Sequence, residues 1–227
     1  MTLLPQTGWL LSKEMRVEFR ELYHLLSLFM FALLLLILLS FALGNNPDLM
    51  KKVAPGLFWI AIFFSSTLTL NSSFRRETED GQWEGLLLLG IDPKALYLGK
   101  FLANLIFLLT LQIILVPFWI VFFDLSFTFS LLSILFLGSI GISTIGTFYA
   151  GLVASFREGP VFLPLLLFPM LVPVLLASVQ ATQYLITQDP FGQQIVWVRL
   201  LIAFDIIFFL GSLSLADFLF EEPQGGK

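Results

Sequence analysis

Long, almost uncharged apolar stretches alternate with short polar breaks along this chain. Six such stretches are present, at about residues 25–43, 53–74, 98–123, 129–154, 161–180 and 198–220. A helix rises about 1.5 Å per residue, so about 20 apolar residues cross the hydrocarbon core of a bilayer. The pattern predicts an all-α integral membrane protein with six transmembrane helices, forming a single membrane domain over residues 1–227.

The segment before the first span, residues 8–24, is too charged to cross a membrane but keeps a helical period. Its side chains sort into an apolar stripe, an acidic flank and a basic flank. In that order they are Leu11, Met15, Phe19, Leu22 and Leu26; Glu14, Glu18 and Glu21; and Lys13, Arg16, Arg20 and His24. We expect an amphipathic interfacial helix with its stripe in the lipid and its acidic flank toward protein. The alternatives are a solvated helix with balanced charges and, for His24 alone, a role as an axial haem ligand.

Charged residues are concentrated between the second and third spans, in a loop of about residues 75–93. Six charged side chains fall within the ten residues Arg75–Glu84. We expect the second span to continue into water as a helix, Gly81 to end it, and Asp92 with Pro93 to begin the next helix. Charges around the apolar Trp83 are typical of a docking element, because charges orient a partner and an aromatic ring supplies buried area. The alternative is a plain solvated hairpin between two spans.

Composition excludes several classes of function. The chain is 58% hydrophobic and 12% charged, with no cysteine and one histidine. Disulfides, Fe–S clusters and multi-histidine or thiolate metal sites are therefore excluded within this chain, and we expect no catalytic residue and no metal. The net charge of −4 argues against a nucleic-acid partner. No G-x-x-x-x-G-K-[ST] phosphate-binding motif is present, so ATP could act only through another chain.

The distribution of Lys and Arg predicts the orientation in the membrane. Nine of the 12 basic residues flank one side of the predicted spans, at positions 13, 16, 20, 75, 76, 94, 100, 157 and 227. The other three are Lys51, Lys52 and Arg199. Basic residues accumulate on the cytoplasmic side, so we expect a multi-pass protein with both termini and the charged loop in the cytoplasm. Lys51 and Lys52 do not fit this orientation, because they flank the opposite side of the predicted spans.

The fourth span carries small residues at every fourth position. They are Ser139, Ser143, Thr147 and Gly151, with Gly138, Gly141 and Gly146 adding further room. Small side chains let helix backbones approach closely in a membrane. We expect a helix-packing seam here, either within the chain or, alternatively, against another protein of the same complex.

The fifth span contains three prolines, Pro164, Pro169 and Pro173. An interior proline removes a backbone hydrogen bond and bends its helix. The freed carbonyl then needs a neighbouring helix or a water-lined cavity. The pattern predicts a broken or hinged helix, with a static kink and a moving gate as the two interpretations.

Asp205 is the one carboxylate deep inside a predicted span. Near the membrane midplane an acid costs about 2.5–3.5 kcal/mol on insertion scales, so it is expected to face protein or water. Arg199, about 9 Å away along the same helix, and Gln112 on the third span are its candidate partners. We favour a structural or partner-facing role over a transport role, because a proton relay usually needs a second intramembrane carboxylate.

Three motifs together resemble a known family. They are Ala54-Pro55-Gly56 with Trp59; Phe74-Arg75-Arg76-Glu77; and Glu79-Asp80-Gly81 with Glu84 and Leu86. Their spacing and their place relative to the spans resemble the haem exporter permease of the cytochrome c maturation system. The steps Leu163-Pro164-Leu165 and Leu171-Val172-Pro173 are similar to that family's proline-rich fifth span. The resemblance covers most of the chain and departs at Gly90, where a proline-containing turn is expected.

The resemblance implies a bacterial inner-membrane, ABC-2-type permease with three partners: an ATP-binding subunit, a haem-handling membrane subunit and a small one-span subunit. The ATPase would dock on the charged loop, at Arg76, Glu79, Asp80, Gly81, Trp83 and Glu84. Haem would be the substrate, or would leave on a carrier, and ATP would bind the partner, so this chain alone is expected to bind no cofactor. The alternatives are a stand-alone secondary transporter or channel, which predicts paired intramembrane charges or an inverted repeat, and a membrane scaffold without energy coupling.

Overall fold

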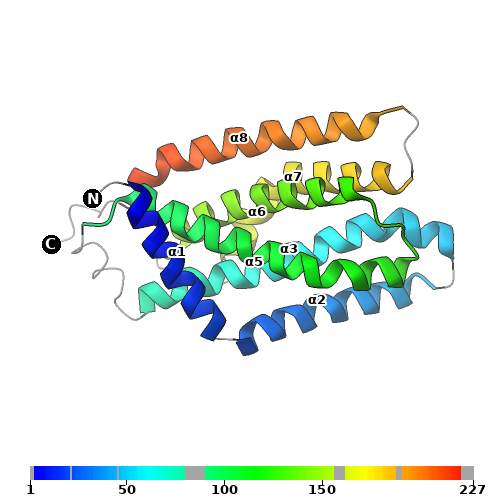
Figure 1. Cartoon of the computed structure of the whole chain (residues 1–227), viewed down its shortest axis with the longest axis horizontal. Helices are drawn as coiled ribbons and strands as arrows, with labels where there is room; N and C mark the ends of the chain where they lie inside the picture. The colour runs from blue at the N-terminus through cyan, green and yellow to red at the C-terminus, as the bar shows by residue number, and fades with distance from the viewer. Residues whose placement is uncertain are drawn as a thin grey trace.

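The computed structural model describes residues 3–20, 22–44, 46–79, 90–155, 162–187 and 191–220, and the statements below concern those residues. They form seven helices and no strand. The helices are α1 (Leu3–Arg20), α2 (Leu22–Ala42), α3 (Pro47–Glu79), α5 (Pro93–Phe123), α6 (Phe129–Ser155), α7 (Phe162–Ile186) and α8 (Gln193–Phe220). Helices α2 to α8 lie lengthwise as an elongated bundle (Figure 1). The predicted all-α membrane fold is confirmed.

The helix lengths agree with the predicted spans. Helices α3, α5, α6, α7 and α8 each contain a stretch long and apolar enough to cross a membrane. Helix α2 has a shorter apolar stretch, Leu26–Ala42. Its 21 residues extend about 31 Å, and it lies against α3 and α5 in the place of the predicted first span. Some helices are longer than their apolar stretches because polar residues continue the helix, as α3 does from the end of its stretch at Leu70 to Glu79.

The start of α5 confirms the predicted helix cap. The Asp92 side chain accepts a hydrogen bond from the Lys94 backbone N–H at 2.9 Å, and Pro93 occupies the first turn, where its missing N–H costs nothing. Gly90 turns the chain toward this cap with φ of +64°, which glycine adopts without strain. At the other end of α5, Asp124 pairs with Lys51 of α3 at 3.1 Å, on the surface of the bundle.

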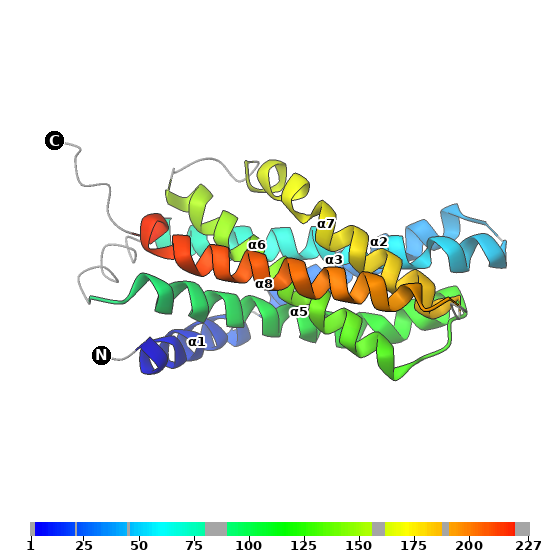
Figure 2. The ribbon, with the colours of Figure 1, turned by 90° about the horizontal axis from the view of Figure 1, so that it is seen from above.

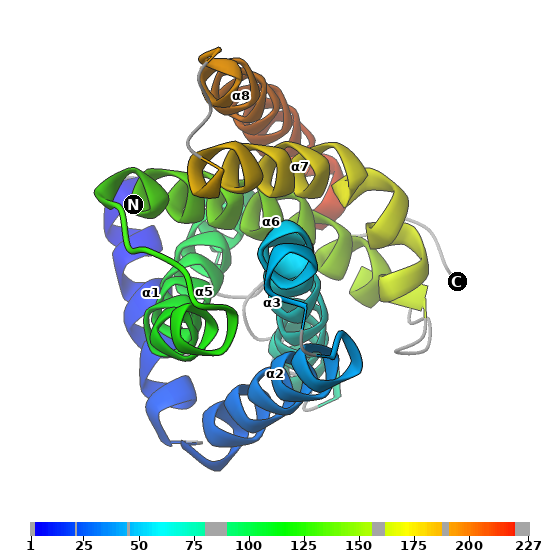
Figure 3. The same ribbon diagram turned by 90° about the vertical axis from the view of Figure 1, so that its right-hand side faces the viewer.

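Helix α6 is the centre of the bundle. It contacts α3, α5, α7 and α8, and the view along the bundle in Figure 3 shows it among them. The first and last described residues lie at the same end of the bundle (Figures 1 and 2). That arrangement agrees with an even number of crossings.

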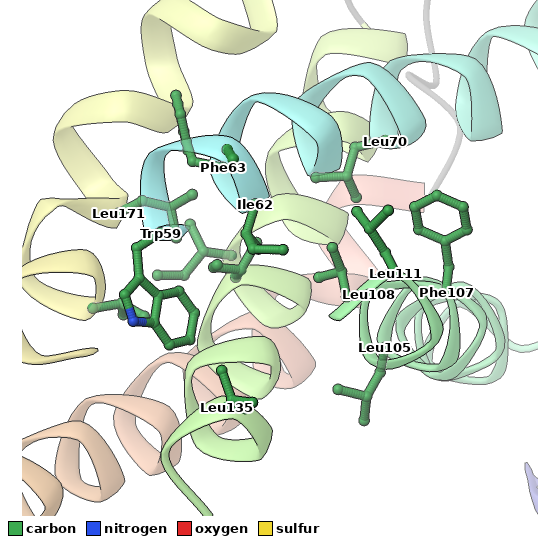
Figure 4. Packing of buried hydrophobic residues seen from close by; sticks show 14 of the residues in the cluster. Trp59, Ile62, Phe63, Leu70, Leu105, Phe107, Leu108, Leu111, Leu135 and Leu171 are labelled. Atoms are coloured by element: carbon green, nitrogen blue, oxygen red, sulfur yellow. The ribbon is translucent and has the colours of Figure 1, made fainter. Parts of the chain in front are cut away.

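Aromatic and branched apolar side chains fill the space between α3 and its neighbours. Figure 4 shows Trp59 and Ile62 of α3 beside Leu171 of α7. Buried indole N–H groups need acceptors. The Trp59 Nε1–H donates to Thr182 Oγ1 at 3.1 Å, and the Trp119 Nε1–H donates to the Ala54 carbonyl at 2.9 Å. These two bonds fix α3 against α7 and α5.

Helix α1 begins and ends earlier than the predicted interfacial helix of residues 8–24. It spans Leu3–Arg20, and residues 22–24 belong to α2. Pro5 is accommodated because the N–H groups of a first turn have no helical acceptor. Thr7 and Leu10 are buried, so they lie on the side of α1 that packs on protein. Leu11 and Met15 of the predicted stripe are only half-buried. Helix α1 lies obliquely along α5 (Figure 1).

Candidate functional site

The predicted coupling loop connects the end of α3 to the start of α5, and these two helix ends lie at the end of the bundle where the first and last described residues lie (Figure 1). Arg76 and Glu79 lie in the last turn of α3, and their side chains are outside the described part. Asp80, Gly81, Trp83 and Glu84 lie outside the described residues. What the structure describes is the frame that receives the loop, namely the first two turns of α5 and the helices attached to them.

Helix α1 holds the first turns of α5 from one side. The Asp92 backbone N–H donates to Gln6 Oε1 at 3.1 Å. Further along α5, Gly99 allows a close approach, because a Cβ at this position would lie 2.7 Å from Leu10 Cβ. The absence of a side chain at Gly99 therefore lets α1 lie directly on the α5 backbone.

A buried ion pair continues the contact between α1 and α5. Lys100 Nζ lies 3.3 Å from Glu14 Oε1, and the exposed fractions of the two side chains are 0% and 14%. Lys13 lies 3.9 Å from the same carboxylate. This geometry confirms, for Glu14, that the acidic flank of the N-terminal helix faces protein. Sequence reasoning missed Lys100, although a lone lysine within an otherwise uncharged stretch was a signal that it needed a partner.

Helix α8 holds α5 from the other side. Lys94 Nζ lies 2.8 Å from Asp217 Oδ2, and both side chains are partly exposed. Nearby, the Tyr97 hydroxyl donates to the Thr144 carbonyl of α6 at 3.2 Å. The start of α5 thus makes polar contacts with α1, α6 and α8.

The small residues of α6 lie in contacts within this chain. The Ser143 hydroxyl donates to the Phe101 carbonyl at 2.8 Å, and Thr147 Oγ1 accepts from Asn104 Nδ2 at 2.9 Å, both on α5. The Ser139 hydroxyl donates to Leu135 in its own helix, and Gly151 is buried. The structure therefore places Ser143 and Thr147 of this seam between α6 and α5, whereas Gly138, Gly141 and Gly146 lie against α3, α7 and α8.

Helix α7 is continuous in spite of its prolines. Pro169 and Pro173 lie inside it, whereas Pro164 is its third residue and removes no internal hydrogen bond. Pro169 is exposed on the surface of the bundle. A hinge at Pro169 and Pro173 stays a prediction, and the helix is not broken there.

Asp205 is buried in the bundle, with 6% of its surface exposed, and neither carboxylate oxygen has a hydrogen-bond partner. The two candidate partners do not reach it. Arg199 is exposed, and the amide of Gln112 is itself buried without a partner. The side chain of His24 is outside the described part.

Comparison with known proteins identifies the family. The family model described as CcmB protein matches residues 6–222. Heme exporter protein B of Pseudomonas aeruginosa is 29% identical over 197 residues, covering 86% of this chain and 88% of that protein. Heme exporter protein B of Haemophilus influenzae is 27% identical over 188 residues, covering 82% and 85%. That of Escherichia coli K12 is 35% identical over 91 residues, covering 40% and 41%.

These matches confirm the resemblance carried by the motifs around Trp59, Arg75 and Glu84. The matched region begins in α1 and continues past the end of α8, so it includes the span segments, the charged loop and the frame that holds it. The chain belongs to the CcmB protein family.

Proposed function

We propose that this chain is the permease subunit of an ATP-driven, ABC-type complex that serves haem export or haem delivery in cytochrome c maturation. The relatives named heme exporter protein B support haem as the cargo. The long apolar helices support a place in the membrane. The proposed location is the bacterial inner membrane, with both termini and the charged loop in the cytoplasm.

The main support for ATP coupling comes from the contacts that the start of α5 makes with neighbouring helices. The charged loop leads directly into a helix whose first turns bind α1 through Glu14 and Lys100 and bind α8 through Asp217 and Lys94. A displacement of the loop would therefore reach three helices at once. Such a frame suits a subunit that receives mechanical work from a partner ATPase docked at Asp80, Trp83 and Glu84.

The other proposed partners are a haem-handling membrane subunit and a small one-span subunit. The complex would either transport haem itself or release a haem-loaded carrier. Both activities would need the same ATP-driven movement of this chain. Haem is a substrate in both versions, and ATP is bound by the partner.

We predict that reversing two loop charges, Asp80→Lys with Glu84→Lys, abolishes capture of the ATP-binding subunit from detergent extracts and stops cytochrome c assembly. The reason is that lysines at both positions would repel the basic groups that a partner needs to meet this acidic segment. The measurement is a pull-down with the tagged full-length chain, together with haem staining of c-type cytochromes.

The matched control is Asp48→Lys with Asp124→Lys, which makes the same charge change on exposed residues at the opposite end of the bundle. The control should keep both capture and assembly. If the loop variant also keeps both, the coupling proposal fails, and a scaffold or a stand-alone transporter explains the family better.

We further predict that Pro169→Leu assembles with its partners but loses cytochrome c output. Leucine restores the backbone hydrogen bond to Leu165 and so stiffens α7 at the proposed hinge. Pro164→Leu is the control, because a first-turn position gains no such bond. Output is measured by haem staining, and normal output from Pro169→Leu would reject the hinge.

A further inference from the structure

Helices α6, α7 and α8 each bury one polar side chain without a hydrogen-bond partner: Thr144, Ser178 and Asp205. Asp205 is 6% exposed, and Thr144 and Ser178 are fully buried. Both oxygens of the carboxylate and both hydroxyls have no partner. Since buried polar groups are nearly always hydrogen-bonded, these exceptions require an explanation, above all the carboxylate.

The glycines of α6 make the space that these groups occupy. A Cβ on Gly141 would lie 2.7 Å from Asp205 Oδ1, so the carboxyl group rests where α6 has no side chain. A Cβ on Gly138 would lie 2.8 Å from Ser178 Oγ. Gly138, Gly141 and Thr144 follow one another at intervals of three along α6 and are therefore neighbours on its surface. Ser178 and Asp205 thus lie against neighbouring positions of α6, and Thr144 is the next residue in this series.

Asp205 has no described positive charge beside it. Helices α5, α6 and α7 pack against α8. The other titratable or charged residues with described side chains on these four helices are Lys94, Tyr97, Lys100, Tyr149, Tyr184, Arg199 and Asp217. Lys94 is paired with Asp217 and Lys100 with Glu14. Tyr97 donates to the Thr144 carbonyl and Arg199 is exposed, so neither neutralises Asp205.

An ionised carboxylate is costly in such surroundings. Without a counter-ion or hydrogen-bond donors in an apolar interior, a carboxyl group takes up a proton and becomes neutral. The neutral acid can also donate a hydrogen bond, which the carboxylate cannot.

We propose that Asp205 is an intramembrane proton-binding site. The carboxyl group holds one proton while α8 is packed on Gly141. When α8 separates from α6 and water enters, the proton passes to water and leaves a carboxylate behind. Low pH should therefore favour the packed arrangement and high pH the separated one. This inference concerns the interior of the bundle and does not depend on ATP coupling at the loop.

The test is infrared spectroscopy of the full-length chain in lipid nanodiscs, with aspartate labelled by ¹³C at its side-chain carboxyl. The label separates aspartic from glutamic acid bands. At neutral pH we expect the C=O stretch of one protonated aspartic acid, lost in Asp205→Asn and kept in Asp217→Asn. Absence of that band from the unsubstituted chain would overturn the proposal without any variant, as would its survival in folded Asp205→Asn.

A second arm tests the link between the proton and the contact of α6 with α8. In Gly141→Ala the added methyl group would lie 2.7 Å from Asp205 Oδ1 and 2.6 Å from Val174 Cγ1, so it would push α8 and α7 away from α6. The acid band should then shrink and the carboxylate band should grow. Gly211→Ala on α8, where a Cβ meets nothing within 4 Å, should leave both bands unchanged. A full acid band in folded Gly141→Ala would disprove the proposed link.

Discussion

Replacing Lys100 by methionine is expected to lower the free energy of unfolding by about 3 kcal/mol. The substitution removes the cation that lies 3.3 Å from Glu14 and leaves this carboxylate, only 14% exposed, beside an apolar side chain. Lys13, at 3.9 Å and itself partly exposed, compensates only weakly. Loss of one partner of a buried ion pair is costly because the remaining charge stays desolvated. Helix α1 should detach from α5 before the rest of the bundle unfolds.

The measurement is denaturant unfolding in detergent micelles, followed by helical circular dichroism and by proteolysis of α1. Lys94→Met is the matched control on the same helix, and it should change stability little, because Lys94 and Asp217 are both partly solvated. The double variant Lys100→Met with Glu14→Leu should recover most of the loss, since an apolar pair of similar volume replaces an ion pair at little cost. A single variant as stable as the unsubstituted chain would show that this ion pair does not secure α1.

Gly138→Ala is expected to cost about 2 kcal/mol, although it adds a single methyl group. The new Cβ would overlap Trp59 Cη2 and would lie 2.8 Å from Ser178 Oγ. The indole cannot move aside easily, because its Nε1–H donates to Thr182 and its ring is buried. The helices α3 and α7 must therefore move away from α6, which opens gaps in a close-packed interior.

Two other glycine variants calibrate this prediction in the same unfolding assay. Gly146→Ala should be milder, because its Cβ would overlap only Leu70 Cδ1, the far end of a flexible side chain. Gly211→Ala should be neutral or slightly stabilising, since nothing lies within 4 Å and alanine favours the helix. Equal stability of Gly138→Ala and Gly211→Ala would mean that α3 and α7 adapt to the added methyl group freely.

Much of the fold could be predicted from the sequence, because the relevant signals are local. Apolar length determines where a chain can cross a membrane, and the predicted spans coincide with α2, α3, α5, α6, α7 and α8 to within a few residues at most ends. The start of α5 could be predicted as well, because Asp92 accepts a hydrogen bond from a first-turn N–H and Pro93 has no N–H that needs an acceptor. The family motifs around Trp59 and Glu84 pointed to the same family as the comparison with known proteins.

The partners of the polar side chains could not be predicted in the same way. A membrane helix that is apolar all round has no periodicity to show which face is buried, so the exposure of Pro169 was not visible. The pairing of Glu14 with Lys100 joins residues 86 positions apart, and that of Trp59 with Thr182 joins residues 123 apart. Arg199 was the nearest candidate for Asp205 along the chain, yet it is exposed on the surface of the bundle.

Apolar length, charge and short motifs were thus enough to establish the helical segments, their order, the cap of α5 and the family. The packing of the helices was needed to learn which charges are paired, which small residues admit a neighbour, and that Asp205 rests on Gly141 without a described counter-ion. The difference arises because crossing a membrane depends on the transfer free energy of a single segment, whereas burial and pairing depend on which segments become neighbours.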